Sequence, residues 1–243
     1  MRTSTIVLIL VGTSAALYGL HYLIFADVTH IFLWSLTSLA FLPISALVLT
    51  LIINRLLSER ERRMRLEKMN MIIGAFFTEV GNRLLGMIAS CDPEVGQLAE
   101  LVDISAAWTD RQFEDLRQRT AQHGFEVDPD AMDLVQLNGF LQDRRDFLLR
   151  QLENSSILEH EVFTALLRAT LHVAEELGYR PSLGDLPESD LKHLSGDLRR
   201  VYALLVRQWI DYVRLLKLSY PYLFSLAIRV NPLKPDSSAI VEN

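Results

Sequence analysis

Two long apolar runs near the N-terminus constrain this chain more than any other feature. Residues 5–25 and residues 31–53 contain no Asp, Glu, Lys or Arg. As helices the runs would measure about 31 Å and about 35 Å, and the hydrocarbon core of a bilayer is about 30 Å thick. Only residues 26–30 separate them, which is enough for a tight turn. The pattern predicts a transmembrane hairpin over residues 1–54.

The first run also has features of a secretory signal peptide. Residues 5–11 would be its apolar core, and Thr13-Ser-Ala15 would be a small-residue cleavage site. However, the apolar run continues for ten residues past Ala15, and only Arg2 precedes it. We interpret the run as a retained span, although the sequence does not decide whether it is cleaved.

A charged collar follows the second run, over residues 55–68. Between Glu59 and Lys68 it holds five basic and three acidic residues. Positive residues that flank a span stay on the cytoplasmic side. We therefore expect a multi-pass membrane protein, with both termini cytoplasmic and the Asp27 turn outside. Cleavage of the first run would leave the rest of the chain on the same side.

Residues 69–233 show the period of amphipathic helices. Met69, Ile73, Phe76, Val80 and Leu84 fall on one stripe of a helix that continues from the collar. No segment alternates as a strand would. We predict an all-α protein in which the second span continues into a cytoplasmic bundle of about six helices. Residues 234–243 are polar, and we expect them to be disordered.

Composition argues against several classes of function. The chain has 24 Lys and Arg against 30 Asp and Glu, and from Met69 onward it has 17 basic against 26 acidic residues. The acidic bundle does not suit nucleic acid, which needs clustered basic residues. Cys91 is the single cysteine, so an internal disulfide is impossible. No phosphate-binding loop, HExxH or Gly-x-Ser-x-Gly motif is present. An enzyme is therefore less expected than a binding protein, and we expect no cofactor.

Histidines and carboxylates on two helices are the sharpest chemical possibility. His172 and Glu175 are three residues apart, and Asp190, His193 and Asp197 share one face of a later helix. Glu and His at such spacings build metal sites in helical bundles. The other interpretation is a solvated strip of charge, because His172 and Glu175 lie opposite the apolar arc of their helix. The sequence leaves both open.

Two features suggest an interaction surface. Gly74, Thr78 and Gly81 lie beside the apolar stripe, where small residues allow close approach of a second helix, including one from another copy. The alternative is that the glycines serve only local packing. Tyr222 and Phe224 belong to a short helix that is apolar on nearly all sides. These two aromatic residues form either a partner surface or part of the core. We expect Phe224 to pack against the Met69–Val80 part of the stripe.

Two segments resemble an uncharacterised group of bacterial membrane proteins. They are the run Leu66–Gly81 and the run Tyr220–Arg229 with the following Asn231-Pro232. The resemblance covers about residues 20–90 and 190–233. It implies a protein of the bacterial inner membrane with two spans followed by a cytoplasmic helical domain, and it implies no activity.

These observations leave two main hypotheses and a third. The first is a membrane-anchored helical module that associates with itself or with another membrane or cytoplasmic protein, besides the lipid bilayer. The second is a metal-dependent enzyme or sensor that uses the His and carboxylate residues. The third is a small-molecule pocket within the bundle. The substrate, the partner and the oligomeric state are not decided by the sequence.

Overall fold

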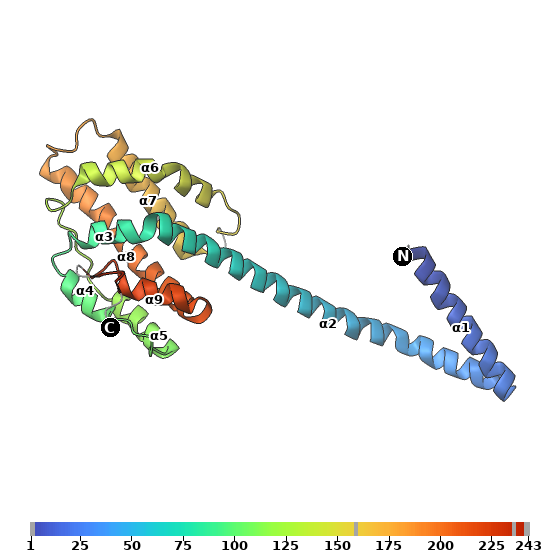
Figure 1. Cartoon of the computed structure of the whole chain (residues 1–243). Helices are drawn as coiled ribbons and strands as arrows, with labels where there is room; N and C mark the ends of the chain where they lie inside the picture. The colour runs from blue at the N-terminus through green and yellow to red at the C-terminus, as the bar shows by residue number, and fades with distance from the viewer. Residues whose placement is uncertain (1–2, 158–159, 235–236, 241–243) are drawn as a thin grey trace. The chain divides into compact units, whose positions relative to one another are not determined.

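In the computed structural model, which describes residues 3–157, 160–234 and 237–240, every regular element is a helix (Figure 1). The all-helical prediction is confirmed for these residues. The chain divides into two compact units, residues 1–63 and residues 64–243.

The first unit contains α1 (Thr3–Phe25) and the beginning of α2 (Val28–Phe76). The turn is shorter than predicted, because Asp27 caps α2. Its Oδ1 atom accepts hydrogen bonds from the backbone N–H groups of Thr29 (2.9 Å) and His30 (3.1 Å). Ala26 completes the reversal with a left-handed φ of 46°. The helix therefore begins at Val28, three residues before the predicted start at Ile31.

Both helices of this unit are apolar and exposed within the structure. Among the described residues, α1 and the helical run that starts at Val28 are long and apolar enough to cross a membrane. None of the residues in the most apolar stretch of either one is buried. Side chains such as Leu8 and Leu23 are 73% and 79% exposed.

The second unit begins with the last turns of α2 and contains the remaining helices. Their bounds are η1, a π-helix (Phe77–Gly81), α3 (Asn82–Ala89), α4 (Val95–Leu101), α5 (Asp110–Ala121), α6 (Leu134–Leu152), α7 (Glu161–Tyr179), α8 (Glu188–Ser219) and α9 (Pro221–Arg229).

The helix α8 is the centre of this unit. It packs against α3, η1, α5, α7 and α9, while α6 packs on α7 and α4 packs on α5 (Figure 1). Its side chains Trp209 and Tyr202 are the two largest that are fully buried. A helix with neighbours on several sides needs apolar residues on several faces. The sequence supplies them from Leu194 to Leu216.

The stripe that the sequence predicted is buried, and α7 and α8 cover it. All five of its residues, from Met69 to Leu84, are less than 8% exposed. The Phe76 ring meets Phe163 of α7 edge to face, with the ring centroids 5.3 Å apart. The neighbouring Phe77 ring stacks on Tyr212 of α8 at 4.8 Å.

The short helix α9 packs on α8. Phe224 is buried, and its ring lies 6.0 Å from Lys217 Nζ. Tyr222 is 72% exposed. The helix therefore buries one face, and its apolar residues on the other faces remain accessible.

The chain after α9 is anchored as far as Lys234, the first residue of the predicted tail. The Asn231 side chain donates to the carbonyl of Val102 at 3.3 Å, and Leu233 is buried. Lys234 forms an ion pair with Asp103. Of the segment predicted to be disordered, residues 235–236 and 241–243 lie outside the described residues.

The π-helix η1 begins at the second of two consecutive phenylalanines that face the core. Phe76 and Phe77 are both fully buried. A π turn inserts an extra residue and shifts the register of the helix. A Cβ atom on Gly81 would lie 2.6 Å from Phe77 Cδ1 and 2.8 Å from Phe76 Cε1. Glycine at this position therefore lets both rings fit.

We predict that Gly81→Ala destabilises the protein by roughly 1–3 kcal/mol, because the added methyl group displaces two packed rings. Gly74→Ala is the matched control, since its Cβ would make an ordinary 3.8 Å contact with Tyr212 Cε2. Helix propensity then favours the alanine by up to about 1 kcal/mol. Thermal unfolding of both variants in detergent measures the difference. Equal melting temperatures would contradict this packing role of Gly81.

Candidate functional site

The contact between α7 and α8 brings together three of the five residues predicted as metal ligands. The Nε2 atom of His172 lies 3.4 Å from Oδ2 of Asp197. The Nε2 atom of His193 lies 3.5 Å from the same oxygen. Two imidazoles from different helices therefore approach one carboxylate oxygen.

The other two predicted ligands have arginine partners instead. Asp190 accepts two hydrogen bonds of 2.7 Å from Arg180. Glu175 accepts a hydrogen bond of 3.5 Å from Arg145 of α6. In their place the structure brings Glu176 to the cluster, with Oε2 at 3.9 Å from His193 Nε2. The signal for Glu176 in the sequence was its spacing of i, i+4 from His172, whereas the predicted ligand Glu175 has the spacing i, i+3.

The arginine Arg180 organises the carboxylates at one end of this cluster. Besides Asp190 it binds Glu176, with Nη1 2.8 Å from Oε2. These hydrogen bonds lower the pKa of both carboxyl groups below their usual values. Both carboxylates therefore stay ionised and link the C-terminal end of α7 to the first turns of α8.

The carboxylate of Asp197 is only half satisfied. Its Oδ1 atom accepts a hydrogen bond of 3.2 Å from Arg200. Its Oδ2 atom, the one that faces the two imidazoles, is buried without a hydrogen-bond partner in the described part of the chain. The residue is 6% exposed. A buried polar atom without a partner is costly, and a bound ligand atom is one way to satisfy it.

The cluster is not a preformed metal centre. Among the residues that the structure describes, no group of three or more His, Cys, Asp and Glu side chains is arranged to hold a metal ion. The cluster is a set of ion pairs and imidazole–carboxylate contacts that link α7 to α8.

The residues predicted as an interaction surface are mostly engaged within the chain. Gly81 is buried against Phe76 and Phe77, and the nearest neighbour of Gly74 is Tyr212. Thr78 is exposed, and its hydroxyl donates to the Gly74 carbonyl at 3.0 Å. The small residues therefore give room to aromatic rings of the same chain. Of the predicted aromatic pair, Phe224 is buried and Tyr222 remains exposed.

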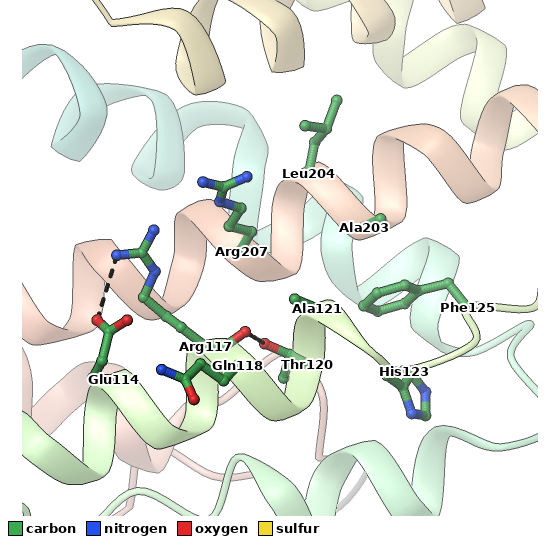
Figure 2. A pocket seen from close by; sticks show the side chains of 10 residues that line it. All are labelled: Glu114, Arg117, Gln118, Thr120, Ala121, His123, Phe125, Ala203, Leu204 and Arg207. Atoms are coloured by element: carbon green, nitrogen blue, oxygen red, sulfur yellow. Dashed lines mark hydrogen bonds and ion pairs between the residues drawn. The ribbon is translucent and has the colours of Figure 1, made fainter.

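A cavity of about 540 Å³ lies between α5 and α8 (Figure 2). The last turns of α5 form one wall, a turn of α8 forms another, and the segment after α5 closes one end. The sequence predicted a pocket within the bundle without its residues, because the walls of the cavity come from segments about 80 residues apart. Its lining residues are Glu114, Arg117, Gln118, Thr120, Ala121, His123, Phe125, Ala203, Leu204 and Arg207.

The comparisons with known proteins agree with the two-part organisation. Residues 2–57 match the model of the N-terminal helical domain of MJ1433, and residues 65–229 match that of the C-terminal helical domain of the uncharacterized protein MJ1433. The uncharacterized protein MJ1433 of Methanocaldococcus jannaschii is 42% identical over 98% of this chain and 96% of its own length. The chain belongs to the MJ1433 family.

Membership of the MJ1433 family carries no assigned activity. The relative is archaeal, so the comparison does not support the bacterial origin that the sequence resemblance implied. No solved structure matches the chain. Any function must therefore be argued from the residues themselves.

We predict that Arg180→Met lowers the melting temperature of this MJ1433-family protein most at neutral pH. The ordinary pKa values are 4.5 for Glu176 and 3.8 for Asp190, and Arg180 lowers both in the folded state. Stability from this link is therefore complete above the ordinary values and is lost as pH falls through the lowered ones. The difference between wild type and variant should shrink below about pH 4.

The control for this experiment is Arg168→Met. Arg168 is an exposed residue of the same helix, and its replacement removes the same charge. Thermal unfolding between neutral and acidic pH compares the three proteins. A loss of stability in Arg180→Met that does not depend on pH would contradict the electrostatic origin of the link.

Proposed function

We propose that the protein is a membrane-anchored helical module that holds a ligand- or partner-binding body at the membrane surface. The observation that carries this proposal is the exposure of the two apolar helices. Water cannot solvate so many contiguous apolar side chains without a large cost in free energy. A bilayer provides the cover that these helices need.

A soluble core and a secretory signal account less well for the apolar helices. The core helix of a soluble protein is mostly buried, whereas the most apolar stretches of these two are not buried at all. A secretory signal would account for α1, but it leaves the long apolar beginning of α2 without cover. The membrane interpretation accounts for both helices at once.

The proposed organisation follows from the charges. Residues 1–54 form the hairpin, residues 55–68 the collar and residues 69–233 the binding body. The basic residues of the collar favour the cytoplasmic side of the membrane. Both termini and the body are then inside, and the turn at Asp27 is outside. This arrangement exposes the body to cytoplasmic ligands and partners.

Topology reporters test this proposal. We expect a reporter fused after Asn243 to be active only in the cytoplasm, and one inserted between Ala26 and Asp27 to be active only outside. Replacing Arg60, Arg62, Arg63 and Arg65 together by Gln should produce a mixed orientation, because these residues supply most of the positive bias.

The matched control replaces four exposed arginines of the body, namely Arg111, Arg119, Arg150 and Arg168. These lie far from the spans in sequence and should leave the orientation unchanged. A soluble protein after membrane fractionation would end the anchoring proposal. A reporter after Asn243 that is active outside would overturn the orientation alone.

The cluster of His172, His193 and Asp197 supports a second candidate function, a metal-dependent sensor. Ligand atoms of a tetrahedral zinc ion lie about 3.3 Å apart when the bonds are about 2.0 Å long. The two imidazole nitrogens lie 3.4 Å and 3.5 Å from the unpartnered oxygen of Asp197. A small rotation of these side chains would direct all three atoms at one cation, which would also satisfy that oxygen.

Zinc titration of the purified full-length protein tests this candidate. We expect one equivalent of Zn²⁺ to bind and to raise the melting temperature, and His193→Ala to abolish both effects. Glu175→Gln is the control, because Glu175 pairs with Arg145 outside the cluster. Binding that survives His193→Ala, or no binding at all, would leave the cluster as a purely structural link.

A further inference from the structure

We infer that the cavity between α5 and α8 binds a small organic acid, one that joins a carboxylate or phosphate to an apolar body. The cavity belongs entirely to the second unit, so the inference does not depend on membrane anchoring. Its volume of about 540 Å³ falls within the range of about 300–1,000 Å³ that is usual for small-molecule sites.

The apolar part of the cavity is already fixed in place. Phe125 contacts Tyr202 and His123 edge to face, with centroid distances of 5.0 Å and 5.1 Å. Tyr202 is itself held, because it is fully buried and its hydroxyl donates to Asp92 Oδ2 at 3.1 Å. An aromatic wall that does not have to be ordered on binding costs a ligand little entropy. Leu204 adds further apolar surface (Figure 2).

The charged part of the cavity has an excess of guanidinium groups. Arg117 and Arg207 line it against the single carboxylate of Glu114. No side-chain hydrogen bond or ion pair within the described residues involves Arg207, which is exposed. An uncommitted guanidinium presents a planar fork of donors that matches a carboxylate or a phosphate.

The second guanidinium is held loosely by its own neighbours. Arg117 lies 3.7 Å from Glu114 Oε2 and 3.4 Å from Asp211 Oδ1. Both separations exceed the usual length of a charge-assisted hydrogen bond, about 2.7–2.9 Å. Burial raises the pKa of Asp211 despite the attraction of Arg117 and Arg207. The carboxylates of the chain therefore leave Arg117 available to a ligand with better geometry.

Two other polar side chains of the lining add no ligand contact. The Nε2 atom of His123 is buried without a hydrogen-bond partner in the part of the chain that the structure describes, so a ligand in the cavity does not reach it in this arrangement. The Thr120 hydroxyl is already bonded to the carbonyls of Leu116 (2.9 Å) and Arg117 (3.1 Å), so it is not a ligand contact.

Calorimetric titration of the full-length protein in phosphatidylcholine nanodiscs tests the inference. The probes are naphthoate, naphthyl phosphate and octanoate, each with a neutral counterpart, namely naphthamide, naphthol and octanamide. We expect at least one acid to bind about tenfold more tightly than its counterpart, since the guanidinium groups recognise the charge. Preference for octanoate would indicate a lipid-derived ligand, and preference for the naphthyl acids a soluble aromatic one.

Three variants distinguish the contribution of the positive charge to binding from that of the cavity volume. Arg207→Leu should weaken binding of the acid about tenfold and leave the neutral compound unaffected. Arg119→Leu removes the same charge from an exposed position of α5 outside the lining, and it should have no effect. Ala203→Trp should fill the cavity and abolish binding of every probe, with helix content unchanged.

The inference fails if no acid binds more tightly than its neutral counterpart. It fails equally if Arg207→Leu and Arg119→Leu weaken binding to the same extent, because the attraction would then be non-specific. Binding that survives Ala203→Trp would place the acid elsewhere and overturn the assignment of this cavity.

Discussion

The burial of α8 is the constraint on which the rest of the helical body depends. This helix packs against α3, η1, α5, α7 and α9, and it supplies the two largest fully buried side chains, Trp209 and Tyr202. Because the neighbours of α8 surround it, a change in its register would displace each of them. The packing density of a protein core makes such displacement costly. Both candidate sites are therefore positioned by the same element.

The two sites use different faces of α8. Near its beginning, His193 and Asp197 face α7, where Arg180 ties the carboxylates of both helices together. Further along, Leu204 and Arg207 face α5 and line the cavity. The Tyr202 side chain lies between these positions in the sequence and connects the cavity wall to Asp92. A ligand at either site would therefore contact the helix on which the packing of the body depends.

The glycines after the collar show which of two interpretations the packing favours. Small residues do mark close approach, as the sequence indicated, and Gly81 has no room for a Cβ atom. What approaches Gly81 is the pair of rings of Phe76 and Phe77 from the same chain, which is local packing. A period of 3.6 residues cannot reveal a π turn, because the turn is a departure from that period. The partner of a small residue is a property of the tertiary structure.

The sequence by itself determined the properties that depend on local pattern. The absence of charge from the two apolar runs, the stripe from Met69 to Leu84 and the lack of alternating segments were enough for the helical class and for the buried face of the helix after the collar. Tertiary structure alone decided which side chains meet. In the folded chain His172 lies beside Asp197 of the neighbouring helix. Asp190 pairs with Arg180, and Glu175 pairs with Arg145. The cavity forms between segments that are about 80 residues apart in the sequence. The physical reason is that helical periodicity places a residue on a face, whereas the neighbour of that face is chosen by the packing of the whole core.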